Sequence, residues 1–129
     1  MTEIFKALSE ESRLRILSIL IDTELCVCEI EATLNLTQSN VSRHLTVLKR
    51  CGIVESRKDA LWTYYRIRLA FQQEHKELWM YLLDGLKKLP TFQSDREACD
   101  ENRARKLCSC NHSDRNSMSR VEKEMCFYE

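Results

Sequence analysis

The sequence is poor in residues that interrupt helices, because its 129 residues include two glycines and one proline. This scarcity favours a chain built mainly from helices. No run of about 18 apolar residues is present, and the first residues carry charges where a secretion signal needs an apolar stretch. We therefore expect a cytoplasmic protein that does not contact a membrane. A glycine-rich loop is also lacking, which argues against an enzyme that binds phosphate-like anions, so we expect no enzymatic activity.

Cysteine is abundant instead, with seven residues, an odd number and a large one for this length. In a reducing compartment, cysteines are typical of metal sites or redox centres rather than of disulfides. The first 25 residues contain none. Two cysteines then form a Cys-x-Cys pair, Cys26 and Cys28, and the other five are Cys51, Cys99, Cys108, Cys110 and Cys126.

The charges are segregated along the chain, although the net charge is zero. Residues 1–36 carry three basic and seven acidic side chains, whereas residues 37–68 carry seven basic and two acidic ones. Zero net charge argues against indiscriminate binding of nucleic acid. A basic block within one segment is nevertheless what contacts to DNA phosphates require.

A helix-turn-helix pattern begins at the cysteine pair, and its second helix lies in that basic block. Two short amphipathic helices are predicted within residues 26–50, and in the second helix Val41, Leu45 and Leu48 recur at i, i+4 and i+7. Thr37 is placed to cap this second helix. In DNA-binding proteins the second helix of such a unit enters the major groove. The polar side chains left to face DNA are Gln38, Ser39, Asn40, Ser42, Arg43 and Thr46.

These side-chain types suit that task, since Asn or Gln can read adenine and Arg can read guanine or grip phosphate. His44 lies near the apolar edge of the helix, and we expect it to be packed and hydrogen-bonded rather than to contact a base. Cys51 and Gly52 follow, and the glycine provides a left-handed stop.

Residues 53–68 change to a period of two and are rich in β-forming residues, which predicts a β-hairpin with a polar tip at residues 57–60. A hairpin directly after a recognition helix is typical of a winged helix. We expect Arg57 and Lys58 to contact the DNA backbone or minor groove. A plain solvated turn is the alternative.

The remaining pattern predicts helices. Residues 4–8 favour a short first helix, and Ser9 is expected to cap a second one. Residues 71–89 predict a single long helix whose apolar stripe serves a homodimer, consistent with a palindromic operator. The fold class is mainly α with a β-hairpin (α+β). We divide the chain into a winged helix-turn-helix and dimerisation domain, residues 1–90, and a polar cysteine-containing tail, residues 91–129, with a charged helix over 93–107.

A soft-ligand pair that leads into a DNA-reading unit predicts a metal-responsive transcription factor. On a helix, positions i and i+2 lie about 200° apart. Cys26 and Cys28, both expected in the first helical turn, would then not face one ion. We therefore expect ion binding to unwind this turn and shift the recognition helix.

Residues from about 3 to 90 resemble the ArsR/SmtB family of metalloregulatory repressors. The resemblance rests on the segments ELCVCEI, SNVSRHLTVLKRCGIV and LWTYYRI. It implies a homodimeric winged-helix repressor that needs no cofactor to bind its double-stranded operator DNA and leaves it when metal binds. In the arsenic-sensing members of the family, As(III) or Sb(III) is held by thiolates from the cysteine box.

The sequence departs from that box at Glu31, where arsenic sensors of the family carry a third cysteine. As(III) prefers three soft thiolates, so a third ligand must come from elsewhere or from a small exogenous group. Cys108 and Cys110 are the first candidates, from the same chain or its partner. Repressors responsive to Cd(II), Pb(II) or Zn(II), and a metal-free thiol redox switch, remain alternatives. The residues that stay unassigned are Cys51, Cys99 and Cys126.

Overall fold

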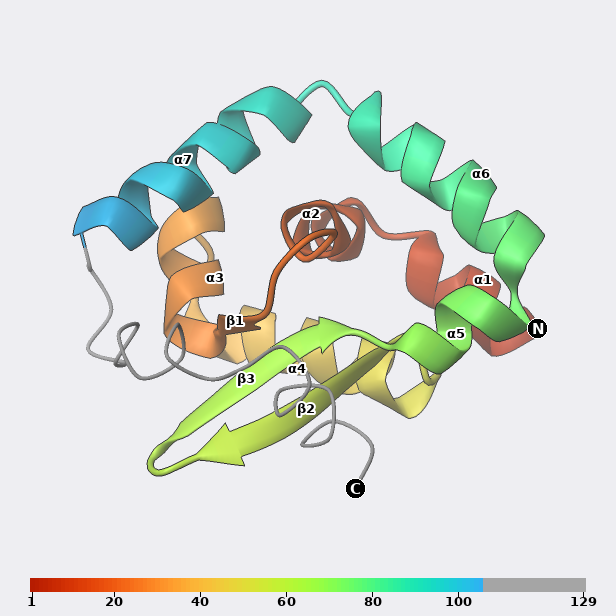
Figure 1. The fold of residues 1–129 in the computed structure, drawn as a ribbon, viewed down its shortest axis with the longest axis horizontal. Helices are drawn as coiled ribbons and strands as arrows, with labels where there is room; N and C mark the ends of the chain where they lie inside the picture. Colours follow the sequence, from red (N-terminus) through yellow and green to blue (C-terminus); the bar gives the residue numbers. More distant parts are fainter. Residues whose placement is uncertain (106–129) are drawn as a thin grey trace.

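The computed structural model describes residues 1–105, and these form a winged helix-turn-helix of the α+β class, as predicted (Figure 1). Within the described residues, no helix is long and apolar enough to span a bilayer. The elements are α1 (Thr2–Leu8), α2 (Glu11–Ile19), β1 (Leu25–Cys26), α3 (Val27–Leu34), α4 (Gln38–Arg50), β2 (Val54–Asp59), β3 (Trp62–Ile67), α5 (Leu69–Glu74), α6 (Lys76–Lys87) and α7 (Phe92–Arg105).

The helix-turn-helix consists of α3 and α4, and its turn follows from two residues. Asn35 ends α3 in the left-handed conformation, with φ 56°, which asparagine tolerates better than most residues. The hydroxyl of Thr37 accepts a hydrogen bond from the amide of Asn40 at 3.2 Å and caps α4. The predicted cap is therefore confirmed.

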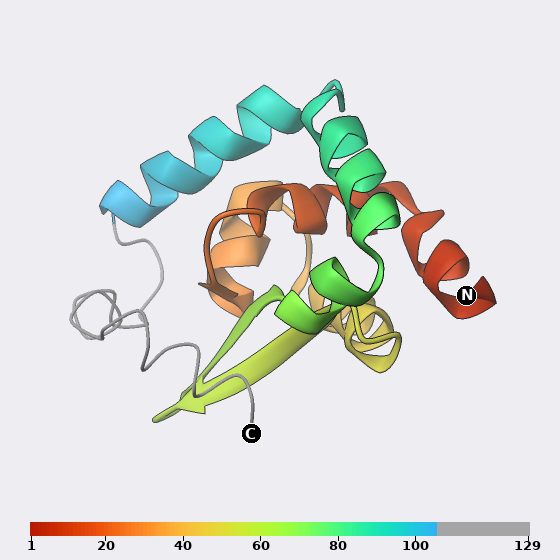
Figure 2. The same ribbon diagram turned by 45° about the vertical axis from the view of Figure 1, so that its right-hand side comes forward.

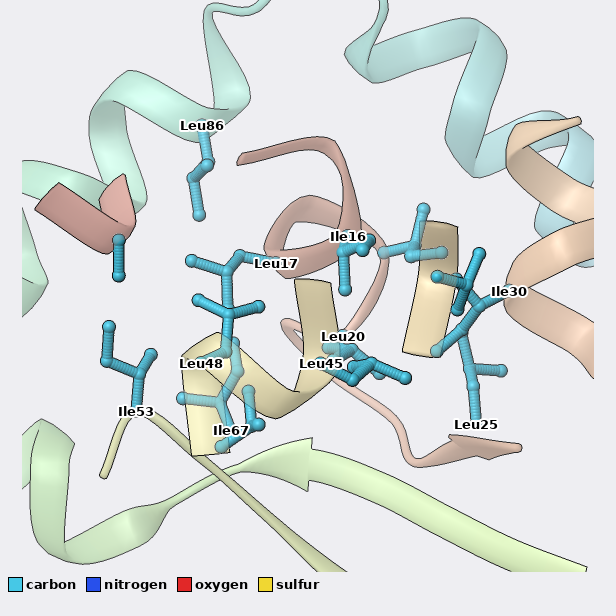
Figure 3. Packing of buried hydrophobic residues seen from close by; sticks show 14 of the residues in the cluster. Ile16, Leu17, Leu20, Leu25, Ile30, Leu45, Leu48, Ile53, Ile67 and Leu86 are labelled. Carbon is cyan, nitrogen blue, oxygen red and sulfur yellow. The ribbon is translucent and has the colours of Figure 1, made fainter. Parts of the chain in front are cut away.

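Helix α2 lies at the centre of the molecule, and other elements of the same chain cover it. Figure 3 shows Leu17 of α2 between Leu86 of α6 and Leu48 of α4, and all three side chains are buried. Fully burying one such side chain stabilises the fold by about 1.5–3 kcal/mol. The helix does not begin as predicted, because Glu10 is its cap and accepts from the amide of Ser12, whereas Ser9 ends α1.

The predicted hairpin is present, and a third strand joins it. The strand order is β1–β3–β2, and both pairings are antiparallel. Strand β2 runs through Asp59, so the turn is shorter than predicted and consists of Ala60, with φ 56°, and Leu61. Strand β1, which was not predicted, places Leu25 opposite Tyr65 and Cys26 opposite Tyr64. We refer to β2 and β3 together as the wing.

The single long helix expected over 71–89 is wrong, because His75 leaves the helical conformation, with φ −121° and ψ 51°, and separates α5 from α6. The break lets Phe71 enter the core, where its ring meets that of Trp79 edge-on at 6.2 Å. Leu82 and Leu86 of the expected dimer stripe are likewise buried within the chain, and α6 packs against α2.

Helix α7 begins at Phe92, one residue before the charged helix predicted over 93–107, and packs along α2 and α3 (Figure 2). Arg15 of α2 holds Asp95 with two hydrogen bonds of 3.0 and 2.9 Å, and Asp95 is buried. Arg96 also reaches Asp22 at 3.1 Å. The first half of this polar helix is therefore attached by ion pairs as well as by apolar contacts.

Candidate DNA-binding surface and thiol site

All six side chains predicted to face DNA are exposed along one side of α4. Two hydrogen bonds order part of this surface. Arg43 donates to the side-chain oxygen of Asn40 at 3.2 Å, and the hydroxyl of Thr46 donates to the carbonyl of Ser42 at 2.8 Å. On the opposite side of the helix, Leu45 is fully buried. The polar side chains of α4 are thus exposed, while the apolar side chains on its other side are packed in the core.

His44 is buried at the edge of that helix, as predicted. Its Nδ1 atom lies 3.4 Å from Nη1 of Arg13 and 3.4 Å from Oε2 of Glu10. Burial lowers the pKa of His44 below its ordinary value, Glu10 opposes this shift, and the charges of Arg13 and Arg43 add to it. All four residues line an open hollow of about 480 Å³ between α2 and α4. His44 therefore belongs to the packing between these two helices.

The wing corrects one predicted position. Arg57 was expected in an exposed tip, but it lies within β2 with its side chain buried. Its Nε donates to Oε2 of Glu24 at 3.0 Å, and its guanidinium lies 4.8 Å from the centre of the Tyr64 ring. A charged side chain is buried at little cost only when it is paired in this way. Arg57 therefore serves the interior of the sheet, while the side chain of Lys58 is exposed.

The sequence did not indicate which residue occupies the tip of the wing. Leu61 is 92% exposed in the two-residue turn, directly before β3. The alternation of residues 61–68 suggested a strand position, and no feature of the sequence separates a strand leucine from a turn leucine here. An exposed leucine at the end of a wing can contact sugars or enter the minor groove.

The cysteine box, residues 24–29, comprises strand β1 and the beginning of α3. Cys26 is the extended residue that precedes α3, and Cys28 lies in the first turn of the helix. Because Cys26 is not helical, the two side chains are on the same side, and their sulfurs lie 2.7 Å apart. The premise that both cysteines occupy a regular helical turn is therefore wrong. The sulfurs meet while α3 is intact.

The side chain of Glu29 stabilises this arrangement, because its Oε1 accepts from the amide of Cys26 at 3.0 Å. In the reduced state, two cysteine thiolates are soft donors that suit a thiophilic ion. Among residues 1–105, however, no three cysteine, histidine or acidic side chains are placed to hold one ion. The described residues therefore bring two cysteine sulfurs together and place no third ligand of this kind beside them.

The other cysteines lie apart from this pair or outside the described residues. Cys99 is buried on α7, and burial raises the pKa of its thiol. Cys51 follows α4, and its thiol lies 3.4 Å from the carbonyl oxygen of Glu3. Cys108, Cys110 and Cys126 lie outside the described residues.

Comparison with known proteins shows that residues 3–56 match the family described as "Bacterial regulatory protein, arsR family". Over 66 residues, the chain is 44% identical to an uncharacterized HTH-type transcriptional regulator of Methanocaldococcus jannaschii, covering 50% of this chain and 74% of that protein. It is 43% identical over 65 residues to the arsenic resistance regulator ArsR1 of Pseudomonas putida, covering 50% of this chain and 51% of ArsR1. The cadmium resistance regulator CadC of Listeria innocua is equally similar, with 43% identity and coverage of 50% and 55%.

Solved structures with the same fold cover a larger share of the chain than these relatives do. HlyU of Vibrio cholerae has 38% identity and a TM-score of 0.54, covering 63% of this chain and 88% of HlyU. The homodimeric winged helix-turn-helix domain of Mb0332 from Mycobacterium bovis has 28% identity and a TM-score of 0.57, covering 68% and 80%. The match covers just over half of each of the two resistance regulators.

Proposed function

This chain belongs to the arsR family of bacterial transcriptional regulators, which are DNA-binding proteins and not enzymes, and from that premise we propose a specific role. We propose that it represses transcription from an operator and is released when As(III) or Sb(III) binds thiolates that include Cys26 and Cys28. The observation that carries the proposal is the pair of sulfurs 2.7 Å apart at the start of the helix-turn-helix.

The proposed DNA surface combines α4 with the wing. Gln38 and Asn40 are candidates to read adenine, and Arg43 is a candidate to read guanine or bind phosphate. Lys58 would bind phosphate, while Arg57 would act only by holding the wing in place. The six exposed α4 side chains in this surface are Gln38, Ser39, Asn40, Ser42, Arg43 and Thr46.

We further propose that the protein binds DNA as a homodimer. Exposed apolar side chains remain on α1 and α6, where Phe5 is 54%, Met80 61% and Tyr81 80% exposed. Figure 1 shows α1 and α6 at the same end of the molecule. A second copy that covers this end would create two-fold symmetry, which matches a palindromic operator.

The third thiolate is proposed to come from the tail, residues 91–129, while residues 1–90 read DNA and dimerise. Arg103 near the end of α7 donates to the hydroxyl of Thr23 at 3.1 Å, and its Nε lies 4.0 Å from Oε2 of Glu29. The helix therefore ends beside the cysteine box. Cys108 follows Arg105, the last residue of α7, by three positions, and three residues span at most roughly 11 Å. We propose that this short connection brings Cys108 and Cys110 to the sulfur pair.

The test is fluorescence anisotropy on DNA from upstream of the gene, titrated with arsenite and separately with cadmium at fixed salt under reducing conditions. Release at a near-stoichiometric arsenite concentration that disappears in Cys26→Ser but persists in Cys51→Ser supports the proposal. A double variant, Cys108→Ser with Cys110→Ser, tests the third ligand and should weaken the arsenite response at least tenfold.

Two alternatives have distinct outcomes in the same assay. Release by cadmium, lead or zinc but not by arsenite would make the protein a divalent-metal sensor; the similar CadC is named as a cadmium resistance regulator. The closeness of the two sulfurs also suits a thiol redox switch. Release by peroxide with chelator present, and by no metal, would favour that reading.

A further inference from the structure

The sulfur of Cys26 is buried against side chains of the sheet and is not at the surface of the helix-turn-helix. Cys26 is 1% exposed, and so is Tyr64, its partner across the β1–β3 pairing. The two side chains form a small apolar cluster of their own, against which Cys28 and Trp62 pack. Both aromatic rings come from β3, a strand of the wing. An ion cannot reach both sulfurs unless contacts made by the wing change.

A buried ion pair forms a second connection between the cysteine box and the wing. Glu24 precedes β1, and its carboxylate receives the guanidinium of Arg57 from β2, with side chains 9% and 3% exposed. The same guanidinium lies over the ring of Tyr64, which is the register partner of Arg57. One charged contact therefore joins the segment before β1 to both strands of the wing.

We propose that Glu24 and Arg57 are positioning residues that transmit inducer binding from the cysteine box to the wing. They hold the box against the sheet, so that when Cys26 and Cys28 turn toward a soft ion, the movement is carried into β2 and β3. The wing then leaves its place on DNA, although α3 and α4 keep their helical structure. The inference rests on the proposed function, because it explains how release occurs.

A matched pair of variants separates this role from general support of the sheet. The coupling variant carries Glu24→Gln and Arg57→Gln, which removes both charges together and leaves no buried ion without a partner. The control carries Glu55→Gln and Arg66→Gln. That pair also joins β2 to β3 at register-paired positions, with a hydrogen bond of 3.0 Å and side chains 14% and 19% exposed.

The measured quantity is the ratio of the DNA dissociation constants with and without saturating arsenite. For the wild type we expect a ratio of about 10 to 100, within the usual range for coupled sites. The coupling variant should show a ratio below about 3, while its arsenite affinity, measured directly by thiolate absorbance, stays within about threefold of the wild type. The control variant should keep the wild-type ratio.

Hydroxyl-radical footprinting supplies a readout that a merely structural role would not change. In the wild type and the control, arsenite should first restore cleavage at the minor-groove positions flanking the palindrome, where the wing binds. In the coupling variant these positions should stay protected. Arg57→Lys keeps the charge but loses the two-pronged contact, and its ratio should fall between those of the wild type and the coupling variant.

The outcomes distinguish two failures. A coupling variant that is folded, binds arsenite and retains the wild-type ratio would overturn the inference alone. If the coupling variant does not fold, Arg57→Lys tests the inference in its place. Its ratio must then be lower than that of the control. Absence of release by arsenite and by cadmium in the wild type would overturn the proposed function, and the inference with it.

Discussion

The recognition helix and the cysteine box are neighbouring parts of one helix-turn-helix, yet they place their functional side chains in opposite environments. Along α4, the side chains proposed to read DNA are exposed, and the apolar ones are buried beneath them. In the box, the side chains of Glu24 and Cys26 are themselves buried. In the proposed function, DNA reading would use a surface that is already formed, whereas sensing would need side chains that the fold has enclosed.

This difference predicts how each region responds to change. An exposed side chain on α4 can be replaced without disturbing the core, so its loss should affect DNA affinity alone. A buried box residue contributes to folding as well as to sensing. Substitutions in the box should therefore change the free energy of unfolding, and ligand binding there should move its neighbours.

The largest expected effect is a loss of stability caused by a substitution in the cysteine box. Glu24→Ala leaves Arg57 buried without its carboxylate, and we expect the free energy of unfolding to fall by about 3–5 kcal/mol. Urea unfolding monitored by circular dichroism measures this change. The control is Asp22→Ala, since Asp22 pairs with Arg96 at an exposed position and should lose less than about 1 kcal/mol. Equal losses in the two variants would refute the contrast.

Within α4, the two sides of the helix should differ almost as strongly. Leu45→Ala creates a cavity at a fully buried position and should lower the free energy of unfolding by about 2–5 kcal/mol. Thr46→Ala, one residue further on, is exposed and should stay within about 0.5 kcal/mol of the wild type. Thermal unfolding of both variants tests this, and a large loss in Thr46→Ala would contradict the assigned orientation.

Arg43→Ala should separate DNA affinity from folding. We expect DNA binding to weaken by about 1–3 kcal/mol because a base or phosphate contact is lost. The free energy of unfolding should stay within about 0.5 kcal/mol, since the side chain is exposed. Anisotropy titrations at several salt concentrations provide the measurement. Unchanged affinity would remove Arg43 from the proposed DNA surface.

The smallest effect concerns His44, a buried side chain on the exposed helix. Burial lowers its pKa, so below its ordinary value of 6.5 the unfolded chain binds more protons than the folded one. Its stabilising contribution is therefore complete above pH 6.5 and declines as the pH falls, by less than about 1.4 kcal/mol per pH unit. Unfolding at pH 7 and pH 5.5 should show a shallower loss in His44→Gln than in the wild type. An equal or steeper loss would exclude His44 as the source.

The parts that the sequence predicted well are those governed by local periodicity. The spacing of Val41, Leu45 and Leu48 identified α4 and its buried side, and Thr37 marked its start. The alternation after Gly52 identified the wing. In each case the decisive interactions join residues a few positions apart, or two strands connected by a short turn.

The parts that were missed depend on contacts between distant segments. Strand β1 is two residues long and exists because Cys26 meets Tyr64, which lies far away in the sequence. Arg57 looked like a wing-tip cation because nothing near it in the chain announces Glu24 as its partner. The sulfur pair was identified, but its geometry was not, since Cys26 takes the extended conformation of that unpredicted strand.

Helix α7 lies beyond the segment that matches the arsR family, yet it packs against α2 and α3. Asp95 and Cys99 are buried, and Arg15 on α2 has its partner there. The helix covers positions of α2 and α3 that would otherwise face solvent, and it thereby constrains them. Substitution of Arg15 is therefore constrained by a helix that lies outside the family match. A chain shortened to residue 90 would expose the positions of α2 and α3 that α7 covers. It would also leave Arg15 without Asp95 as its partner.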